Sequence, residues 1–304
     1  MARVSILIPV YNDVCTRLVS CISKIADATQ GLVYEIVVAE DGSDDVEKMG
    51  KNSQVAAMAH CRYIKRDNNV GRAAIRNFLA NEAQFEWLLF LDCDVDIDNC
   101  AFFSNYIEAA ATHKVVYGGL SIGGDSEKLR SNLRYIYEKH SEPRQTAAIR
   151  NGHPYQSFRT TNFFIARAVM LAHPFNEHIK TYGYEDVMFG KAMQESRIPI
   201  FHIDNQVHYM HYEDNPKYLS KTEEAMRTLY DFRSGLADFS SLIMLQKKLH
   251  SCRLDLLFDV MFRFMHKRWK EKLISPHPSV GVYNAYRFCL FNHLCRHHGS
   301  AKLH

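Results

Sequence analysis

Short apolar runs alternate with stretches of helical spacing in the N-terminal part of the chain. Residues 4–8, 34–39 and 88–91 are mostly apolar and predict buried strands, and residues 63–64 belong to a further short strand. Residues 9–12, which include a proline, are predicted to be the loop that ends the first strand. This alternation of strand and helix predicts an α/β fold with a mainly parallel sheet flanked by helices.

Further elements follow at less regular intervals. Residues 141–158 mix proline, glycine, histidine and arginine without a period, and predict an irregular loop that acts as a lid over a substrate, with a disordered segment as the alternative. Helical spacing returns at Tyr218 and continues toward the C-terminus. Before the loop, we expect helices at residues 99–113 and 126–140 and a strand at residues 115–119. Between the loop and Tyr218, we expect strands at residues 160–165 and 200–203.

The composition excludes several classes of protein. Hydrophobic residues make up 47% of the chain, but no apolar stretch approaches the about 20 residues needed to span a bilayer. The eight cysteines form no Cys-x-x-Cys pair and no regular framework, and the N-terminus resembles no signal peptide. We therefore expect a cytoplasmic protein.

Positive charge is concentrated at the C-terminal end. Residues 241–304 hold 11 Lys and Arg against 3 Asp and Glu, a net charge of +8, whereas the rest of the chain holds 26 against 31, a net charge of −5. An apolar stripe in this basic region predicts either a core-packing helix or a helix on the anionic inner face of a membrane. The stripe consists of Leu254, Leu257, Phe258, Met261, Phe262 and Met265.

Acidic residues stand at the ends of two predicted strands. Asp92 and Asp94 follow the third long apolar run with Cys93 between them, and residues 40–41 end the second run. Because the carboxyl ends of parallel strands meet at one edge and bind ligands there, these groups predict a single site. Two close carboxylates repel each other unless a cation lies beside them, and oxygen ligands with phosphate suit Mg²⁺ or Mn²⁺. The alternative is a surface loop that merely contains aspartates.

A glycine opens the next predicted helix. Gly71 precedes an alanine-rich stretch whose amino end offers free N–H groups and a positive dipole. Arg72 and Arg76 are four residues apart and lie on one helical face. Arg72, in the first turn, is the candidate ligand of a diphosphate or a base, whereas Arg76 fits a solvated basic face equally well.

Four motifs together resemble the family 2 glycosyltransferases of the GT-A fold. They are, in order, Ser-Ile-Leu-Ile-Pro-Val-Tyr-Asn at residues 5–12, Glu-Asp-Gly-Ser-x-Asp at 40–45, Asn-x-Gly at 69–71 with Arg-Asn at 76–77, and Asp-Cys-Asp at 92–94. The resemblance fades after about residue 233. It implies a Rossmann-like GT-A domain with a C-terminal helical appendage. The expected division is residues 1–233 for the catalytic domain, with a nucleotide-binding half at 1–98 and an acceptor half at 99–233, and a basic helical region at 234–304.

The resemblance also implies roles for the motif residues. The donor would be a nucleotide-diphosphate sugar, usually of uridine, and transfer would invert the anomeric carbon. Val10 and Tyr11 would line the nucleoside pocket, Asp41 would contact the base, and Asp94 would bind the metal. The other implied donor-binding residues are Pro9, Glu40 (in place of the family's commoner Asp), Arg72, Asp92 and Cys93.

Two adjacent carboxylates lie in an aromatic setting at residues 182–190. Glu185 and Asp186 resemble the acceptor-side motif of the same family, although acidic residues also favour a helix amino end without further function. Inverting transfer needs one base to take the proton of the acceptor hydroxyl. We predict Asp186 as that base and Glu185 as a ligand of acceptor hydroxyls, with exchange of the two roles as the alternative. Apolar neighbours would raise the carboxylate's pKa and make it a better base.

Histidines near residue 210 are candidates for a further metal ligand. Many relatives place a histidine in this region, and His208 and His211 are both available, with His211 the first choice. The pair His297 and His298 near the C-terminus is predicted to be a solvated chain end rather than a ligand site.

These inferences predict a metal-dependent inverting glycosyltransferase that uses Mn²⁺ or Mg²⁺. It would move one sugar to a hydroxyl of a saccharide or lipid-linked acceptor, in surface polysaccharide or glycolipid assembly, without a nucleic-acid partner. Polymerising synthases of the family carry Gln-x-x-Arg-Trp, whereas Met265 precedes Arg268 and Trp269 here, which favours single-sugar transfer. The alternatives are a sugar nucleotidyltransferase and a non-catalytic nucleotide- or carbohydrate-binding protein on the same scaffold.

Overall fold

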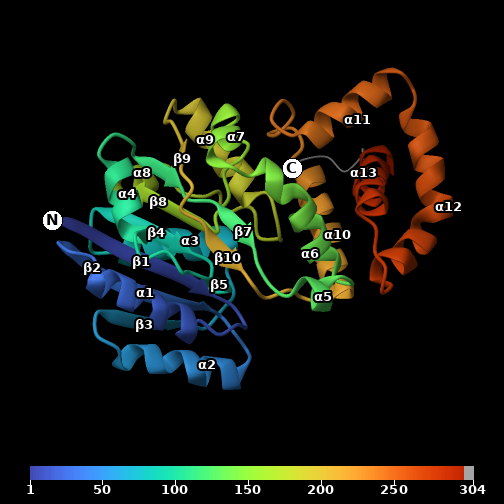
Figure 1. The fold of residues 1–304 in the computed structure, drawn as a ribbon. Helices are drawn as coiled ribbons and strands as arrows, with labels where there is room; N and C mark the ends of the chain where they lie inside the picture. The colour runs from blue at the N-terminus through green and yellow to red at the C-terminus, as the bar shows by residue number, and fades with distance from the viewer. Residues whose placement is uncertain (298–304) are drawn as a thin grey trace. The chain divides into compact units, whose positions relative to one another are not determined.

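The computed structural model describes residues 1–297, which fall into two compact units (Figure 1). The sheet unit comprises Met1–Gly123, Glu142–Lys180 and Glu185–His211, and the helical unit comprises Gly124–Ser141, Thr181–Tyr184 and residues 212–297. The helical unit is larger than the appendage expected after residue 233, because α6 (Leu133–Ser141) and α10 (Asn215–Asp231) pack with the C-terminal helices. His298 lies outside the described residues.

A seven-stranded sheet forms the centre of the sheet unit, in the order β3-β2-β1-β4-β8-β6-β9. The first four of these strands are parallel, β8 is antiparallel to both of its neighbours, and β6 is parallel to β9. The predicted mainly parallel sheet is therefore confirmed. The strands are β1 (Ala2–Val10), β2 (Leu32–Asp41), β3 (Cys61–Arg66), β4 (Trp87–Leu91), β6 (Val115–Tyr117), β8 (Asn162–Ala166) and β9 (Phe201–His202). A smaller sheet joins β5 (Val95–Asp96), β10 (Val207–Tyr209) and β7 (Leu120–Ile122).

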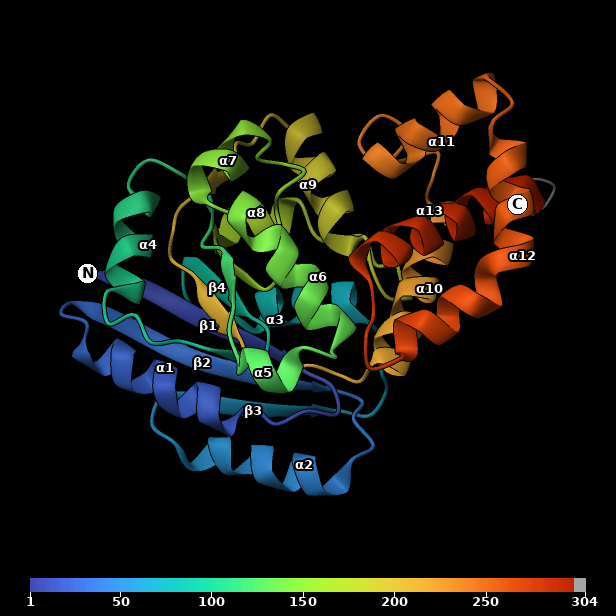
Figure 2. The same cartoon turned by 45° about the vertical axis from the view of Figure 1, so that its right-hand side comes forward.

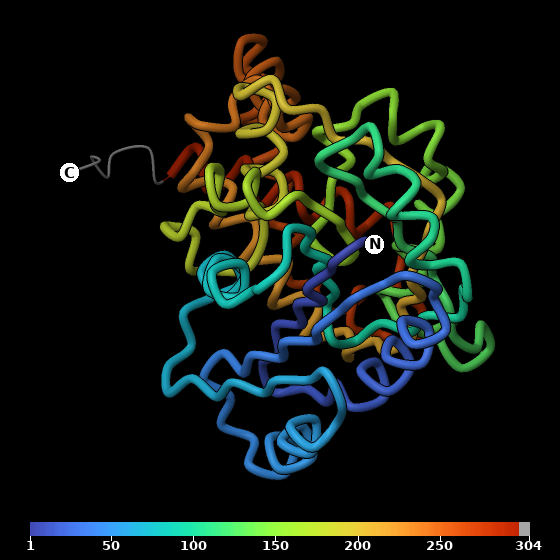
Figure 3. The backbone as a smooth tube through the Cα atoms, turned by 90° about the vertical axis from the view of Figure 1, so that its left-hand side faces the viewer, coloured from blue at the N-terminus to red at the C-terminus, as the bar shows by residue number. Residues whose placement is uncertain are grey.

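Helices cover both faces of the large sheet, which explains why its central strands are apolar on both sides. Side chains alternate along a strand, so Leu7 packs against α3, whereas its neighbours Ile6 and Ile8 are buried on the other face. Figure 3 follows the alternation of strand and helix along the blue and cyan part of the chain. The helices of the sheet unit are α1 (Thr16–Ala28), α2 (Val46–Asn52), α3 (Arg72–Glu82), α4 (Phe102–Ala110), α7 (Ala147–Gly152), α8 (Arg167–Ala172) and α9 (Glu185–Glu195), with 3₁₀ turns η1 (Ser53–Ala57) and η2 (Glu142–Arg144).

The end of β1 differs from the prediction that residues 9–12 form a loop. Pro9 and Val10 belong to β1 and pair with Ala39 and Glu40 of β2. Pairing of β1 with β4 stops at Leu7, so the missing N–H of proline removes no hydrogen bond between those two strands. The loop therefore begins only after Val10.

The predicted helix over residues 126–140 is interrupted. Two helices occupy this segment, α5 (Ser126–Leu129) and α6 (Leu133–Ser141). Asn132 lies between them, and its side-chain oxygen accepts a hydrogen bond from the backbone N–H of Tyr135 at 2.9 Å. This side-chain bond starts a new helix where a continuous one was expected.

The segment predicted as an irregular loop, residues 141–158, contains a helix. Helix α7 begins after Thr146, whose hydroxyl accepts the N–H of Ile149. Its Arg150 is 1% exposed and donates hydrogen bonds to the backbone oxygens of Gln145 and Ile203. The aperiodic sequence hid this helix because a buried arginine anchors it rather than an apolar stripe.

The helical unit has its own core, formed by α6, α10, α12 (Asp255–Ile274) and α13 (Val280–His297), with α11 (Ser241–Ser251) beside α12 (Figure 2). The apolar stripe of α12 was predicted either to pack in a core or to lie on a membrane, and its residues differ in burial. Phe258, Met261 and Phe262 pack in this core, whereas Leu254 and Leu257 are 47% and 63% exposed. Within residues 1–297, no helix combines the length and the apolar character that crossing a membrane requires.

Candidate active site

The polar residues singled out in the sequence gather at one edge of the large sheet. The carboxyl ends of β1, β2 and β4 meet there because the three strands are parallel and adjacent. Asp41 ends β2, and Asp92 follows β4 directly. Helix α3 starts at the same edge with Gly71 as its N-cap residue. The predicted single site is thus assembled by the strand order.

Asp41 holds the loop that leads into α3. Its two carboxylate oxygens accept the backbone N–H groups of Val70 at 3.1 Å and Gly71 at 3.0 Å. Burial raises the pKa of Asp41 above its ordinary value, although these two hydrogen bonds oppose the rise. Each carboxylate oxygen keeps a second lone pair, so Asp41 can still accept a hydrogen bond from a nucleobase.

Gly42 is required by the close approach of this loop. Its φ is +66°, and a Cβ atom on it would lie 2.1 Å from the backbone nitrogen of Asn69. The chain after β2 and the loop before α3 therefore touch through their backbones, which only glycine permits.

Glu40 lies on the other side of β2 from Asp41, as adjacent strand residues must. Its carboxylate is 1% exposed, accepts hydrogen bonds from Asn52 Nδ2 at 2.7 Å and the Tyr63 hydroxyl at 3.2 Å, and is also bonded to Ser43. These contacts give Glu40 a supporting position beneath the loops, although its resemblance to the family motif implied donor contact.

The loop after β1 is pinned by Asn12. Its side-chain oxygen accepts the N–H groups of Asp44 and Asp45 at 3.0 and 3.1 Å, and its φ is +51°. Val10 is 1% exposed, whereas the next side chain, Tyr11, is 51% exposed. Of the two residues implied for a nucleoside pocket, Tyr11 is therefore the one that a ligand from solvent can reach. Pro9 is partly buried.

Arg72 joins Asp92, at the end of β4, to the Glu185–Asp186 motif. Its Nε donates to Glu185 Oε1 at 2.6 Å, and its Nη2 donates to Asp92 Oδ2 at 3.4 Å. Arg76, one turn later on α3, is 2% exposed and also bonds Asp92. Burial alone would raise the pKa of Asp92, but the Arg76 and Arg72 guanidiniums hold it below its ordinary value. The carboxylates of β4 and α9 thus share one cluster of positive charge.

Asp186 follows Glu185 in the first turn of α9, and its environment differs. Burial, and then the negative charge of Glu185, raise the pKa of Asp186 to about 6. Its Oδ1 accepts the N–H of Val187 at 2.7 Å. A carboxylate with this pKa is ionised at neutral pH and is a stronger base than an ordinary aspartate.

Cys93 and Asp94 lie in the turn after β4, and both are partly buried. Burial and the neighbouring charge of Asp94 raise the pKa of the Cys93 thiol well above its ordinary value. The thiol is therefore neutral, and Asp94 offers the hard anionic oxygen that a divalent cation would bind.

The two candidate histidines have different surroundings. His208, on β10, is bonded at both ring nitrogens, to Ser121 Oγ at 2.5 Å and to Asp98 Oδ1 at 2.7 Å. His211 follows β10 and is exposed. In the described chain, Asp94, His208 and His211 do not form a cluster with all ligand atoms within 4.8 Å of one another.

Two residues of the site had no predicted role in it. Arg76 fitted a solvated face equally well in the sequence, yet its side chain is buried against Asp92. Its spacing of four from Arg72 was the available signal, because both side chains then face the same strand end. Asn12 stood in the first motif without a role, and only the fold reveals its bonds to Asp44 and Asp45.

This sheet, with carboxylates at its edge and a Glu–Asp pair across an arginine, is a GT-A glycosyltransferase fold. The family model described as Glycosyl transferase family 2 matches residues 5–172, more than half of the chain. The chain belongs to this family of glycosyltransferases.

Solved structures of similar shape have low sequence identity. TarS of S. aureus (residues 1–349, in complex with UDP) aligns with a TM-score of 0.51 and 14% identity over 99% of this chain and 92% of that chain, which supports the fold. Glucosyl-3-phosphoglycerate synthase from Mycobacterium tuberculosis, in complex with Mn²⁺, UDP and glucosyl-3-phosphoglycerate, aligns with a TM-score of 0.48 and 13% identity over 76% of this chain and 79% of that one.

One curated relative has higher identity over a shorter stretch. Dolichol-phosphate mannosyltransferase of Pyrococcus furiosus is 35% identical over 95 residues, which is 31% of this chain. The match spans about a quarter (26%) of the length of that relative.

Proposed function

We propose that this glycosyltransferase moves a single sugar, with inversion, from a nucleotide-diphosphate sugar to an acceptor hydroxyl, and that a divalent cation assists. A uridine-diphosphate sugar is the first donor to test. The acceptor class is a saccharide or a lipid-linked saccharide, as in surface polysaccharide or glycolipid assembly.

The bridge formed by Arg72 carries this proposal. One guanidinium contacts Asp92 on the donor side and Glu185 on the acceptor side, at 3.4 and 2.6 Å. Asp186, next to Glu185, has a pKa of about 6. A base therefore stands beside positive charge suited to a diphosphate, which is the pairing that direct displacement at an anomeric carbon needs.

In the proposed reaction, Asp186 accepts the proton of the acceptor hydroxyl as that oxygen attacks the anomeric carbon. The new carbon–oxygen bond forms as the bond to the diphosphate oxygen breaks, and the nucleoside diphosphate leaves with the bonding electron pair. Arg72 and the amino end of α3 face the negative charge that develops on the leaving group. Glu185 holds an acceptor hydroxyl in position, and exchange of the roles of Glu185 and Asp186 is the alternative.

The residues present fit a hard divalent cation such as Mn²⁺ or Mg²⁺. Asp94 supplies a carboxylate oxygen, and His211 is exposed, whereas both nitrogens of His208 are already bonded. The first-choice histidine is therefore His211, with remaining positions left for water and substrate phosphates. Such a cation would neutralise charge on the diphosphate.

The deciding experiment measures release of free nucleoside diphosphate from a panel of uridine- and guanosine-diphosphate sugars, with and without Mn²⁺. Asp186→Asn should lower the rate about 10²- to 10⁴-fold, the range for loss of a general base, while UDP binding measured by calorimetry stays within about twofold. The matched control is Glu195→Gln at the exposed end of the same helix, which should leave the rate unchanged.

Three results would contradict the proposal. Retention of most activity in Asp186→Asn would remove the assigned base. Failure of every sugar nucleotide to yield free diphosphate, despite UDP binding, would instead favour the non-catalytic binding protein, and release of pyrophosphate from a nucleoside triphosphate would favour the sugar nucleotidyltransferase.

A further inference from the structure

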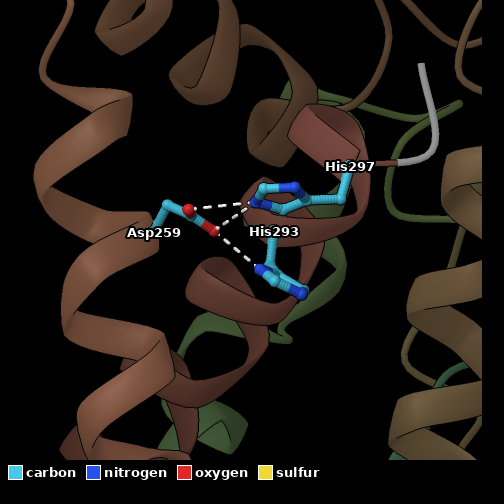
Figure 4. Close-up of side chains that lie close together, drawn as sticks. All are labelled: Asp259, His293 and His297. Atoms are coloured by element: carbon cyan, nitrogen blue, oxygen red, sulfur yellow. Dashed lines mark hydrogen bonds and ion pairs between the residues drawn. The ribbon is translucent and has the colours of Figure 1, made fainter. Parts of the chain in front are cut away.

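The facing surfaces of α12 and α13 carry ionisable side chains that sugar transfer does not use. Asp255 and Asp259, four residues apart on α12, are 1% and 4% exposed. Asp255 pairs with Arg296 of α13. Asp259 instead faces two histidines of α13, and Figure 4 shows the side chains of Asp259, His293 and His297 pointing toward one another.

The three side chains offer ligand atoms at short range. His293 Nδ1 lies 2.6 Å from Asp259 Oδ1, and His297 Nε2 lies 3.0 Å from Asp259 Oδ2. All three ligand atoms lie within 4.8 Å of one another, and no other group of three His, Cys, Asp or Glu in residues 1–297 does so. The histidines are four residues apart, so one helical face presents both, a spacing that zinc sites use.

Hydrogen bonds alone do not satisfy this cluster. His297 Nε2 contacts both the Asp259 carboxylate and, at 2.8 Å, the Nη2 of Arg263. If Nε2 carries a proton, two donors face each other; if it carries a lone pair, two acceptors face each other. A cation among the three side chains removes this conflict, because every lone pair then points at it.

We infer that Asp259, His293 and His297 bind a transition-metal ion, with Zn²⁺ the best match to two imidazole nitrogens and one carboxylate oxygen. Tetrahedral Zn²⁺ with bonds of about 2.0 Å holds its ligand atoms about 3.3 Å apart. The two separations from Asp259, 2.6 Å to His293 and 3.0 Å to His297, are shorter than that by a few tenths of an ångström, and rotation of the side chains can widen them. Water from the solvent-facing side fills the fourth position.

The neighbouring charges permit this site. The Asp259 carboxylate is 4% exposed and faces two imidazoles and the Arg263 guanidinium, which stabilise its negative charge. Arg263 lies 3.1 Å from Asp259 but is 55% exposed, so it can turn into solvent when the ion binds. Arg296 is held by Asp255, and its Nε remains 3.9 Å from Asp259. The ion would join α12 to α13 and thereby stabilise the helical unit.

The test uses the full chain stripped of metal with a chelator. Calorimetry should show one Zn²⁺ bound per chain with Kd below about 10 µM, and Co²⁺ as a spectroscopic probe should give the visible absorption of a four-coordinate site. Saturation should raise the melting temperature by about 4 °C or more.

Three variants assign the ligands. His293→Gln and His297→Gln should each weaken Zn²⁺ binding at least about tenfold. The matched control His277→Gln changes an exposed histidine in the connection between α12 and α13, and should leave binding intact. The variant Asp94→Asn separates this site from the proposed Mn²⁺ site and should bind Zn²⁺ as the unaltered chain does.

Arg263→Gln keeps the inference testable if the histidine variants fail to fold, because it removes only a competing exposed cation. It should tighten Zn²⁺ binding several-fold. Absence of saturable Zn²⁺ binding in both the unaltered chain and Arg263→Gln would overturn the inference. It would also be overturned if folded His293→Gln and His297→Gln bound Zn²⁺ as tightly as the unaltered chain. The cluster would then be an ion-pair contact between two helices.

Discussion

Asp186→Asn should make the protein more stable while it removes the proposed base. The charged carboxylate of Asp186 is disfavoured in the fold by burial and by Glu185, which together raise its pKa from 3.8 to about 6. An asparagine of the same shape avoids that cost. The variant thus removes the electrostatic cost of the buried charge while it keeps the packing of the side chain.

The magnitude and the sign follow from this pKa. A rise from 3.8 to about 6 is worth at most about 3 kcal/mol, and contact of the side chain with water reduces the expected gain to about 1–2 kcal/mol. Because the folded pKa is raised, the protonated carboxyl contributes stability at low pH, and this contribution is lost as pH rises through about 6. The advantage of asparagine is therefore near zero at about pH 4, grows to about pH 6 and is constant above it.

Thermal unfolding of the two proteins at pH 4.5 and pH 8 tests this without any substrate. At pH 8 the variant should melt about 2–5 °C higher, and at pH 4.5 the difference should fall to about a third of that value. Glu195→Gln, which changes an exposed carboxylate on the same helix, should show little difference at either pH. A variant that is less stable at pH 8, or a difference that is equal at both values, would refute the reasoning.

Three further outcomes are expected. Gly42→Ala should lower the free energy of unfolding, measured in urea, by at least about 2 kcal/mol, because the added Cβ meets the Asn69 backbone. The control Gly31→Ala, where φ is also positive but nothing lies within 4 Å, should lose only about 1 kcal/mol. Equal losses would contradict the steric argument. Arg76→Met leaves Asp92 with only its longer contact to Arg72, and should lower the free energy of unfolding by about 3 kcal/mol in the same assay. A loss under about 1 kcal/mol would argue against a strong buried ion pair. The alternative in which α12 lies on an anionic membrane predicts that Phe264, which is 79% exposed, contacts the lipid. Phe264→Asp should then reduce co-sedimentation with anionic vesicles, and undiminished sedimentation would exclude this helix as the contact.

The parallel part of the sheet could be predicted because each strand is apolar along its length and is followed by polar residues. The sequence could not predict that β8 inserts between β4 and β6. That choice depends on pairs such as Phe90 with Phe163, whose rings stack 4.7 Å apart although 73 positions separate them in the chain. The helix α7 was missed for a related reason. Its anchor, Arg150, is buried by backbone oxygens from distant segments, and no local pattern records such partners.

The site residues could be located from the sequence more securely than their individual contacts. The strand ends identified Asp41 and Asp92, and the fold brings both to one edge. Adjacent residues in a strand face opposite ways, so the sequence alone indicated that Glu40 and Asp41 would not face the same side of the sheet. The bridge from Arg72 to Glu185 could not be foreseen, because 113 positions separate these residues and only the packing of α3 and α9 on the same sheet face brings them together.

The shared guanidinium of Arg72 has a kinetic implication. A nucleotide diphosphate carries more negative charge than a carboxylate, so its binding at the proposed donor site would draw Arg72 away from Glu185. Glu185, released from its ion pair, would then become available to the acceptor alcohol. We therefore expect compulsory order, with the sugar nucleotide entering first and the acceptor second, and product inhibition by the nucleotide that is competitive against the donor alone.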